Sequence, residues 1–146
     1  MAETPVFPTD PAVLASFLEA AGSDRLPGLL GIELIELTRG RSVMRLEVDR
    51  RHEASNGYLH AGTVVTLADT ACGYGTVASL PDGANGFTTI ELKCNHLSTL
   101  RSGGMVARAS MVHGGRSTQV WDATVTAEAT GKTVAIFRNT QLILYP

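Results

Sequence analysis

Asp69 is the one charged residue in a long run of apolar and small residues, LHAGTVVTLADTACGYGTVAS (residues 59–79). No basic residue lies within one helical turn of it along the chain. An ionised carboxylate in an apolar setting costs several kcal/mol unless it is paired or hydrogen-bonded, so its presence needs a reason. Either Asp69 is a catalytic nucleophile or general base, or it makes a structural hydrogen bond with Thr66, Thr70 or a strand backbone.

The start of the same run, HAGT (residues 60–63), is a candidate oxyanion site. If the run is a helix, the N–H groups of Ala61, Gly62 and Thr63 have no partner within it and lie at its positive dipole end. Such donors stabilise a polarised carbonyl or an oxyanion, and the small side chains let a ligand approach them. The alternative is that Gly62 only relieves crowding.

The spacing of these two features predicts a homodimer. Ala61 and Asp69 are eight residues apart, about 12 Å along a helix, whereas catalytic groups must act within about 3 Å of the reacting atoms. One helix cannot present both to a single carbonyl. We therefore expect Asp69 of one protomer to meet the helix start of another, as an antiparallel pair of helices across a two-fold axis allows.

The elements that position these residues follow from the hydrophobic pattern. Residues 61–79 are too long for a usual strand and apolar on every side, which predicts a buried helix. Its small residues should let strands or a second subunit approach closely: Ala61, Gly62, Ala68, Ala71, Gly73 and Gly75. Strands are predicted at 31–38, 42–49, 87–98, 104–113, 116–129 and 132–145. The expected fold class is α+β, with one antiparallel sheet curled around the helix.

A second helix is predicted in TDPAVLASFLEAAG (residues 9–22). Thr9 or Asp10 is its N-cap and Pro11 lies in its first turn. Its apolar stripe is expected to pack against the rest of the protein and consists of Val13, Leu14, Phe17 and Leu18.

Composition limits the classes of function. The 146 residues are 44% hydrophobic and carry a net charge of −2, and the basic residues are scattered, so neither nucleic acid nor an anionic membrane is an expected partner. The sequence has no signal peptide and no membrane-spanning run, so we expect a cytoplasmic protein. Cys72 and Cys94 lack the spacing of a zinc or redox pair and are interpreted as reduced core residues.

Other chemistry finds little support in the sequence. His52, His96 and His113 are not spaced as metal ligands, so no metal is predicted. No serine lies in a G-x-S-x-G setting, which disfavours a serine hydrolase. Trp121 is expected to pack in the core with Ala123 and Val125, and Tyr58 is a candidate ligand contact.

The segment RHEASNGYLHAGTVVTLADTACGYG (residues 51–75) resembles the hotdog-fold acyl-CoA thioesterases, in particular the phenylacetate-degradation type. FTTIELKCNHL and GGRSTQVWDATVTAEATGKTVAIFRNTQ extend the resemblance, which covers about residues 28 to 145. It implies a sheet wrapped around a central helix, a dimer or dimer of dimers, and hydrolysis of acyl-CoA with no cofactor beyond the coenzyme A of the substrate. On this basis we expect a helical extension over 1–27 and a single hotdog domain over 28–146.

The resemblance also implies roles for single residues. Asp69 matches the catalytic carboxylate, as nucleophile or general base, and Ala61 matches the backbone N–H that polarises the thioester carbonyl, with Gly62 beside it. His60 matches the motif histidine and is expected to shape the loop. The family's asparagine is replaced by Ala54, which makes Asn56 the candidate for its work. Gly73 stands where some relatives carry a hydroxyl, so Thr66 or Thr70 is expected to orient water.

Contacts to the coenzyme A part of the substrate are expected from one strand face and from arginines. In 87–98, simple alternation places Thr88, Ile90, Leu92 and Cys94 toward the core. The opposite face is the candidate border of a CoA channel and consists of Thr89, Glu91, Lys93 and Asn95. Arg101, Arg108 and Arg116 are candidates for the phosphates.

Two other functions stay open at this point. One is a non-catalytic acyl-CoA sensor, and the other is a hydratase or dehydratase of the same fold, which would need a histidine beside the carboxylate. The sequence leaves the acyl group open between aryl and short or medium chains.

Overall fold

The central helix α3 (Ala61–Ala78) is confirmed within one residue of its predicted end. The protein is described by a computed structural model that covers residues 6–146. His60 is the N-cap of α3, with extended backbone and a side chain that accepts from the Gly62 N–H. At the other end the Ser79 Oγ accepts from the Gly40 N–H, and the Ser79 carbonyl accepts from Gln119 Nε2. Both ends of α3 are therefore fixed by polar contacts.

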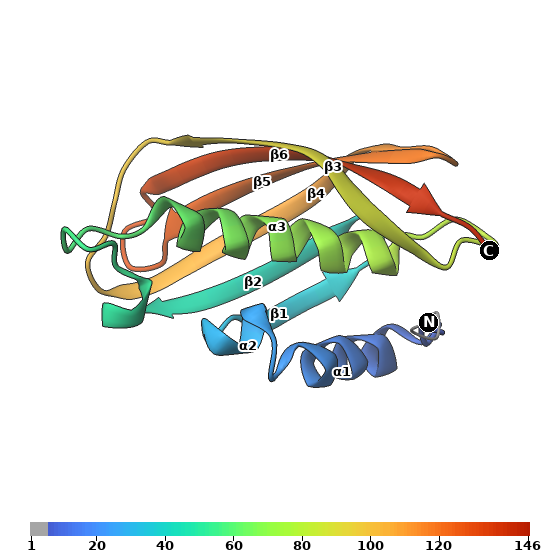
Figure 1. Cartoon of the computed structure of the whole chain (residues 1–146), viewed down its shortest axis with the longest axis horizontal. Coiled ribbons are helices and arrows are strands. Elements are labelled where there is room, and N and C mark those ends of the chain that lie inside the picture. Colours follow the sequence, from blue (N-terminus) through green and yellow to red (C-terminus); the bar gives the residue numbers. More distant parts are fainter. Residues whose placement is uncertain (1–5) are drawn as a thin grey trace.

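All six predicted strands are present and form one antiparallel sheet in the order β1-β2-β4-β5-β6-β3. The strands are β1 (Glu33–Thr38), β2 (Arg41–Val48), β3 (Gly86–His96), β4 (Gly103–Gly114), β5 (Thr118–Ala127) and β6 (Thr133–Leu144). Figure 1 shows the sheet curving over α3. This arrangement confirms the α+β hotdog fold.

The core lies between α3 and the inner face of the sheet. Leu67 and Ala68 of α3 are fully buried, as are Met105 and Trp121 on the strands. A Cβ atom on Gly75 would lie 2.5 Å from Cη2 of Trp121, so only glycine allows α3 to approach β5 this closely. The prediction that small residues permit close approach is confirmed here, and so is the prediction that Trp121 is a core residue.

The N-terminal helix α1 (Pro11–Gly22) packs on the outside of this unit, as predicted. Asp10 is its N-cap and accepts from the N–H groups of Ala12 and Val13. Leu14 and Leu18 are buried against Leu37 and Val77. The predicted apolar stripe includes two residues that are not buried, because Val13 is 55% exposed and Phe17 is 37% exposed.

Two short helices were missed by the sequence analysis. They are α2 (Leu26–Leu29) and the 3-10 helix η1 (Arg50–His52). Each is shorter than the window over which periodicity can be recognised. Residues 1–5 of the predicted N-terminal extension lie outside the described part of the chain. Among the helices of residues 6–146, none has the length and apolar character needed to cross a membrane.

The predicted alternation of β3 is wrong before a bulge in the strand and correct after it, where Cys94 packs against the core and Glu91, Lys93 and Asn95 are exposed. The register of β3 with β6 shifts between Thr89 and Glu91. Because a bulge adds one residue to the strand, the side chains before it and those after it follow opposite alternations between the two faces. Thr89 therefore lies opposite buried Gln141 on the inner face and donates to its Oε1 at 2.7 Å. Thr88 and Ile90, expected in the core, are exposed.

Candidate active site

Asp69 lies in the middle of α3 and faces the inner side of β6. Its Oδ1 accepts a hydrogen bond from Nδ2 of Asn139 at 2.9 Å. Asn139 is 1% exposed and pairs in the sheet with Trp121 on β5. Because an ionised carboxylate can only accept, the amide nitrogen must face it. The bond fixes one carboxylate oxygen and leaves the other available to a ligand.

Burial sets the protonation behaviour of Asp69. The carboxyl group is half-buried, and loss of solvation raises its pKa, while the Asn139 hydrogen bond partly lowers it. Within residues 6–146 no Lys, Arg or His side chain forms an ion pair with it. A carboxylate with a raised pKa is a better base and nucleophile than an exposed one.

The threonines expected near Asp69 have different environments. Thr66 Oγ1 donates to the Gly62 carbonyl at 2.7 Å, inside the helix. Thr70 lines a pocket together with Asp69 and Gly73. The structural alternative for Asp69 required a hydrogen bond to a threonine or a strand backbone, and its partner is instead the Asn139 amide.

The start of α3 offers fewer donors than the sequence predicted. The Gly62 N–H is taken by His60 Nδ1 at 2.7 Å, and the Thr63 N–H donates to the His60 carbonyl at 3.0 Å. The Ala61 N–H has no acceptor within residues 6–146. The expectation of three free donors is therefore wrong for Gly62 and Thr63, because the N-cap histidine satisfies both. Ala61 remains as the candidate oxyanion donor.

The loop before α3 is held by His52, which is completely buried. Its Nδ1 accepts from the Asp49 N–H, and its Nε2 contacts the Leu30 carbonyl at 2.8 Å. The His52 carbonyl accepts from the His60 N–H and from Thr63 Oγ1. His52 thus positions His60, the N-cap of α3.

Asn56 forms a turn in this loop. Its Oδ1 accepts from the Tyr58 N–H at 3.2 Å, and the side chain is exposed. Within the described residues Asn56 makes no hydrogen bond to Asp69. The structure therefore shows a local contact for Asn56, and its catalytic role stays a prediction.

Asp69 opens onto an apolar pocket of about 420 Å³ between α1 and α3. On the α3 side it is lined by Asp69, Thr70, Gly73, Tyr74 and Val77, with Phe87 from β3. The remaining lining residues come from the N-terminal segment and are Phe7, Phe17, Leu18, Ala21, Gly22, Arg25 and Pro27. The volume is in the range of small-molecule sites.

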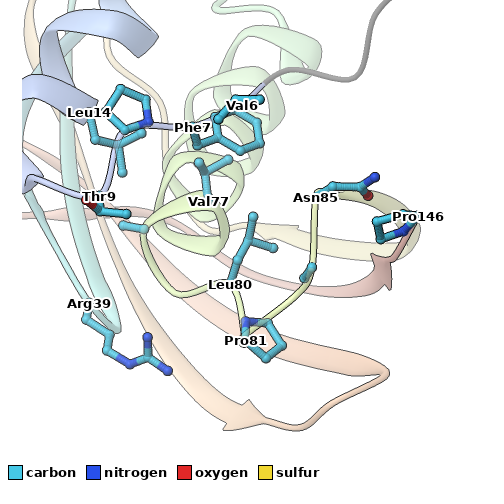
Figure 2. A pocket seen from close by; sticks show the side chains of 13 residues that line it. Val6, Phe7, Thr9, Leu14, Arg39, Val77, Leu80, Pro81, Asn85 and Pro146 are labelled. Atoms are coloured by element: carbon cyan, nitrogen blue, oxygen red, sulfur yellow. The ribbon is translucent and has the colours of Figure 1, made fainter.

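A larger cavity, about 650 Å³, adjoins this pocket at Phe7 and Val77 but is not lined by Asp69. Figure 2 shows it between the N-terminal segment, the last turn of α3 and the loop that leads into β3. Arg39 is the one charged side chain among the described residues that line it. Val77, which lines this cavity, is eight residues from Asp69, or about 12 Å along α3. The smaller pocket is the candidate site, because it is the one lined by the Asp69 carboxylate.

The profile of the thioesterase superfamily matches residues 56–134, more than half of the chain. The chain belongs to the thioesterase superfamily. It is 37% identical to 1,4-dihydroxy-2-naphthoyl-CoA hydrolase from Listeria monocytogenes over 111 residues, 76% of this chain and 89% of that protein. It is also 28% identical to acyl-coenzyme A thioesterase PaaI from Escherichia coli over 121 residues, 80% of this chain and 81% of that protein.

Solved structures agree with this assignment. A mutant thioesterase from Pseudomonas aeruginosa superposes with a TM-score of 0.82 at 29% identity, covering 98% of this chain and 96% of that one. A thioesterase from Haemophilus influenzae superposes with a TM-score of 0.82 at 27% identity, covering 99% and 96%. The protein is thus a thioester hydrolase with the hotdog fold.

The residues suggested for coenzyme A are spread over this thioesterase. Glu91, Lys93 and Asn95 are exposed on the outer face of β3, away from α3. Arg101 and Arg116 lie at opposite ends of the twelve-residue strand β4, which spans roughly 35–40 Å. Arg101 stacks over the Tyr58 ring at 5.4 Å, near the start of α3, so of these two arginines it is the one at the Ala61 end.

Asn139 is the contact of Asp69 that sequence reasoning missed. The signal was present, since Asn139 and Gln141 occupy the same alternating positions of β6 as Ala135, Phe137 and Ile143, all of them buried. A polar side chain in the buried phase of a strand needs a polar partner inside the protein.

Residues 6–146 contain no group of three or more His, Cys, Asp or Glu side chains arranged to hold a metal.

Proposed function

We propose that this thioesterase hydrolyses acyl-CoA thioesters with Asp69 as nucleophile or general base. The observation that carries the proposal is the half-buried carboxylate of Asp69, held at one oxygen by Asn139 and lining an apolar pocket. Coenzyme A as the thiol is supported by the Listeria and Escherichia coli relatives, both of which are named for CoA thioesters.

The reaction adds water to the thioester and releases an acid and a thiol. With Asp69 as base, it takes a proton from water while the water oxygen bonds to the carbonyl carbon. The C–S bond then breaks, and the thiolate takes up the proton to leave as coenzyme A. With Asp69 as nucleophile, the acyl group passes first to its oxygen, and water releases it in a second step.

The oxyanion donor in this proposal is the Ala61 N–H of a partner subunit. Ala61 and Asp69 of one chain are eight residues apart on α3, about 12 Å, too far to act on one carbonyl. The unpaired N–H at the helix start supports Ala61 as the donor. Such a donor contributes about 10²–10³-fold in kcat. A homodimer, or a dimer of dimers, with shared sites follows from this arrangement.

The two alternatives predict different chemistry. A hydratase or dehydratase would use a histidine beside the carboxylate, and among the described residues none lines the Asp69 pocket. A sensor would bind acyl-CoA without turnover, and loss of Asp69 would change its affinity rather than a rate.

The test is thiol release by the wild type and by Asp69→Asn over aryl-, short- and medium-chain acyl-CoAs, with binding measured in parallel. We expect turnover by the wild type, and binding with a rate lowered by about 10²–10⁴-fold in Asp69→Asn. Binding by both proteins without thiol release would overturn the proposal in favour of a sensor. An unchanged rate in Asp69→Asn would remove Asp69 from the mechanism.

A further inference from the structure

The larger cavity, about 650 Å³, is aliphatic inside and cationic at its rim. Leu14 and Val77 are buried in its wall, whereas the Arg39 side chain is exposed. Figure 2 shows Arg39 at one side of the cavity, apart from these two residues. Among the described residues that line it, Phe7 is the one aromatic side chain and Arg39 the one charged side chain. A small molecule that complements this space combines an apolar body with a negative group.

Arg39 has no acidic partner. Within residues 6–146 it forms no ion pair, whereas Arg41 on the same hairpin pairs with Glu36 at 3.0 Å. Asp82 follows Pro81, which lines the cavity, but it makes no ion pair with Arg39 either. An unpaired guanidinium presents a planar fork of N–H donors that matches the two oxygens of a carboxylate. Arg39 is thus available to a carboxylate ligand.

The turn that carries Arg39 is held against the end of α3. The Gly40 N–H donates to Ser79 Oγ at 2.8 Å, and the Gly40 carbonyl accepts from the Met111 N–H at 3.0 Å. Gly40 has a φ of 79°, a conformation that favours glycine. Because the backbone beside the cavity is already fixed, a ligand has only the Arg39 side chain to order, which lowers the entropic cost of binding.

The Asp69 pocket is a poorer place for a free carboxylate. An ionised Asp69 repels a second negative group at close range, whereas the larger cavity presents a cation and is not lined by Asp69. Phe7 and Val77 line both spaces, and the ring of Phe7 meets that of Phe17 edge to face, with centroids 6.1 Å apart. A ligand in the larger cavity would therefore contact side chains that also border the Asp69 pocket.

We infer that the larger cavity is a second ligand site, which binds a free aliphatic carboxylate with its chain among Phe7, Val77 and Leu80 and its carboxylate at Arg39. The ligand is a fatty acid anion and not the thioester that is hydrolysed. The site does not depend on the proposed function, because neither Asp69 nor Ala61 lines it.

The test compares octanoate with its uncharged analogue octanamide. Binding is followed by two-dimensional NMR titration of the isotope-labelled full chain, without acyl-CoA. The wild type should bind octanoate saturably and about three- to tenfold more tightly than octanamide, as a charge-assisted contact to an exposed arginine provides. The amide signals of Leu80 and Ala84, which line the cavity, should shift on binding.

The matched pair Arg39→Gln and Arg41→Gln tests the carboxylate contact. Each variant removes one positive charge from the same exposed hairpin, but only Arg39 lines the cavity. Arg39→Gln should bind octanoate and octanamide equally, and Arg41→Gln should keep the wild-type preference. Comparing two ligands in two variants isolates the pairwise contact from the general loss of charge.

A second pair tests the cavity itself. Ala84 lines the cavity, and Ala129 is exposed in the turn between β5 and β6. Ala84→Leu fills part of the space and should weaken both ligands by about tenfold or more. Ala129→Leu should bind them as the wild type does.

Three outcomes would overturn the inference. The first is no saturable binding of octanoate by the wild type, or shifts confined to Asp69 and Gly73, which would place the ligand in the smaller pocket. The second is a preference for octanoate that Arg39→Gln keeps or that Arg41→Gln loses equally. The third is unchanged affinity in a folded Ala84→Leu; if that variant does not fold, the arginine pair and the shifted signals decide. None of these outcomes bears on thiol release, so failure here is distinct from failure of the proposed function.

Discussion

The amide nitrogen of Asn139 lies 2.9 Å from Oδ1 of Asp69, although seventy residues separate them in the sequence. The bond joins β6, the last strand along the chain, to the central helix, between a buried amide and a half-buried carboxylate. It opposes the rise in the pKa of Asp69 that burial causes. Asn139 is therefore a positioning residue for the carboxylate.

Asn139→Leu should move the acid limb of the kcat/KM profile to higher pH. Without the amide donor, the ionised form of Asp69 loses its stabilising contact, so its pKa rises further. A loss of stability of about 1–3 kcal/mol should accompany the change. The measurement is kcat/KM against pH over the range where the fold stays intact by circular dichroism.

Gln141→Leu is the control for that experiment. Gln141 is also fully buried on the inner face of β6, two residues further on, and it bonds Thr89 rather than Asp69. It should lower stability without moving the acid limb. If both variants shift the limb equally, the effect belongs to the packing of β6 and not to the contact with Asp69.

Asp69→Asn should be at least as stable as the wild type at pH 7. The folded-state pKa of Asp69 is raised, so the folded protein binds the proton more tightly than the unfolded chain. Stability from this group is present below the unfolded pKa of about 4 and is lost as the pH rises through the folded value. The melting temperatures of the two proteins should therefore converge toward pH 4, whereas a less stable variant at pH 7 would contradict this account.

Ala61→Pro tests the oxyanion donor with little change to the helix. Proline is well tolerated at the first position of a helix, where it removes only an N–H that has no helical acceptor. The backbone of His60 is already extended, as a residue before proline requires. We expect kcat to fall by about 10²–10³-fold with the helix content unchanged. Ala61→Gly, which keeps the N–H, should retain most of the rate.

Mixing the two inactive chains tests whether the site is shared. A heterodimer of Asp69→Asn and Ala61→Pro has two shared sites. One of them combines the intact Asp69 with the intact Ala61, and the other combines the two substituted residues. Random pairing of equal amounts should restore about a quarter of the wild-type rate. Co-expressed chains that stay as inactive as either parent would show that Asp69 and Ala61 do not act across subunits.

Gly75→Ala should destabilise the protein by about 1–2 kcal/mol, because the clash with Trp121 exceeds the gain in helix propensity. Chemical denaturation measures the change. Gly86→Ala is the control, since a Cβ atom there meets nothing within 4 Å and the backbone is not left-handed. Equal effects at the two positions would remove the close approach of α3 and β5 as the cause.

The sequence alone determined the two long helices, the six strands and the carboxylate. The apolar run with Asp69 in its middle predicted α3 within one residue, and alternation predicted all six strands, because both patterns are local. Tertiary structure decided what faces Asp69. Asn139 reaches it only because β6 lies under α3, and Thr89 joins the inner face only because a bulge shifts the register. Phe17 lines the pocket rather than the core because α1 packs through Leu14 and Leu18. These contacts join segments far apart in the chain, and no local pattern encodes them.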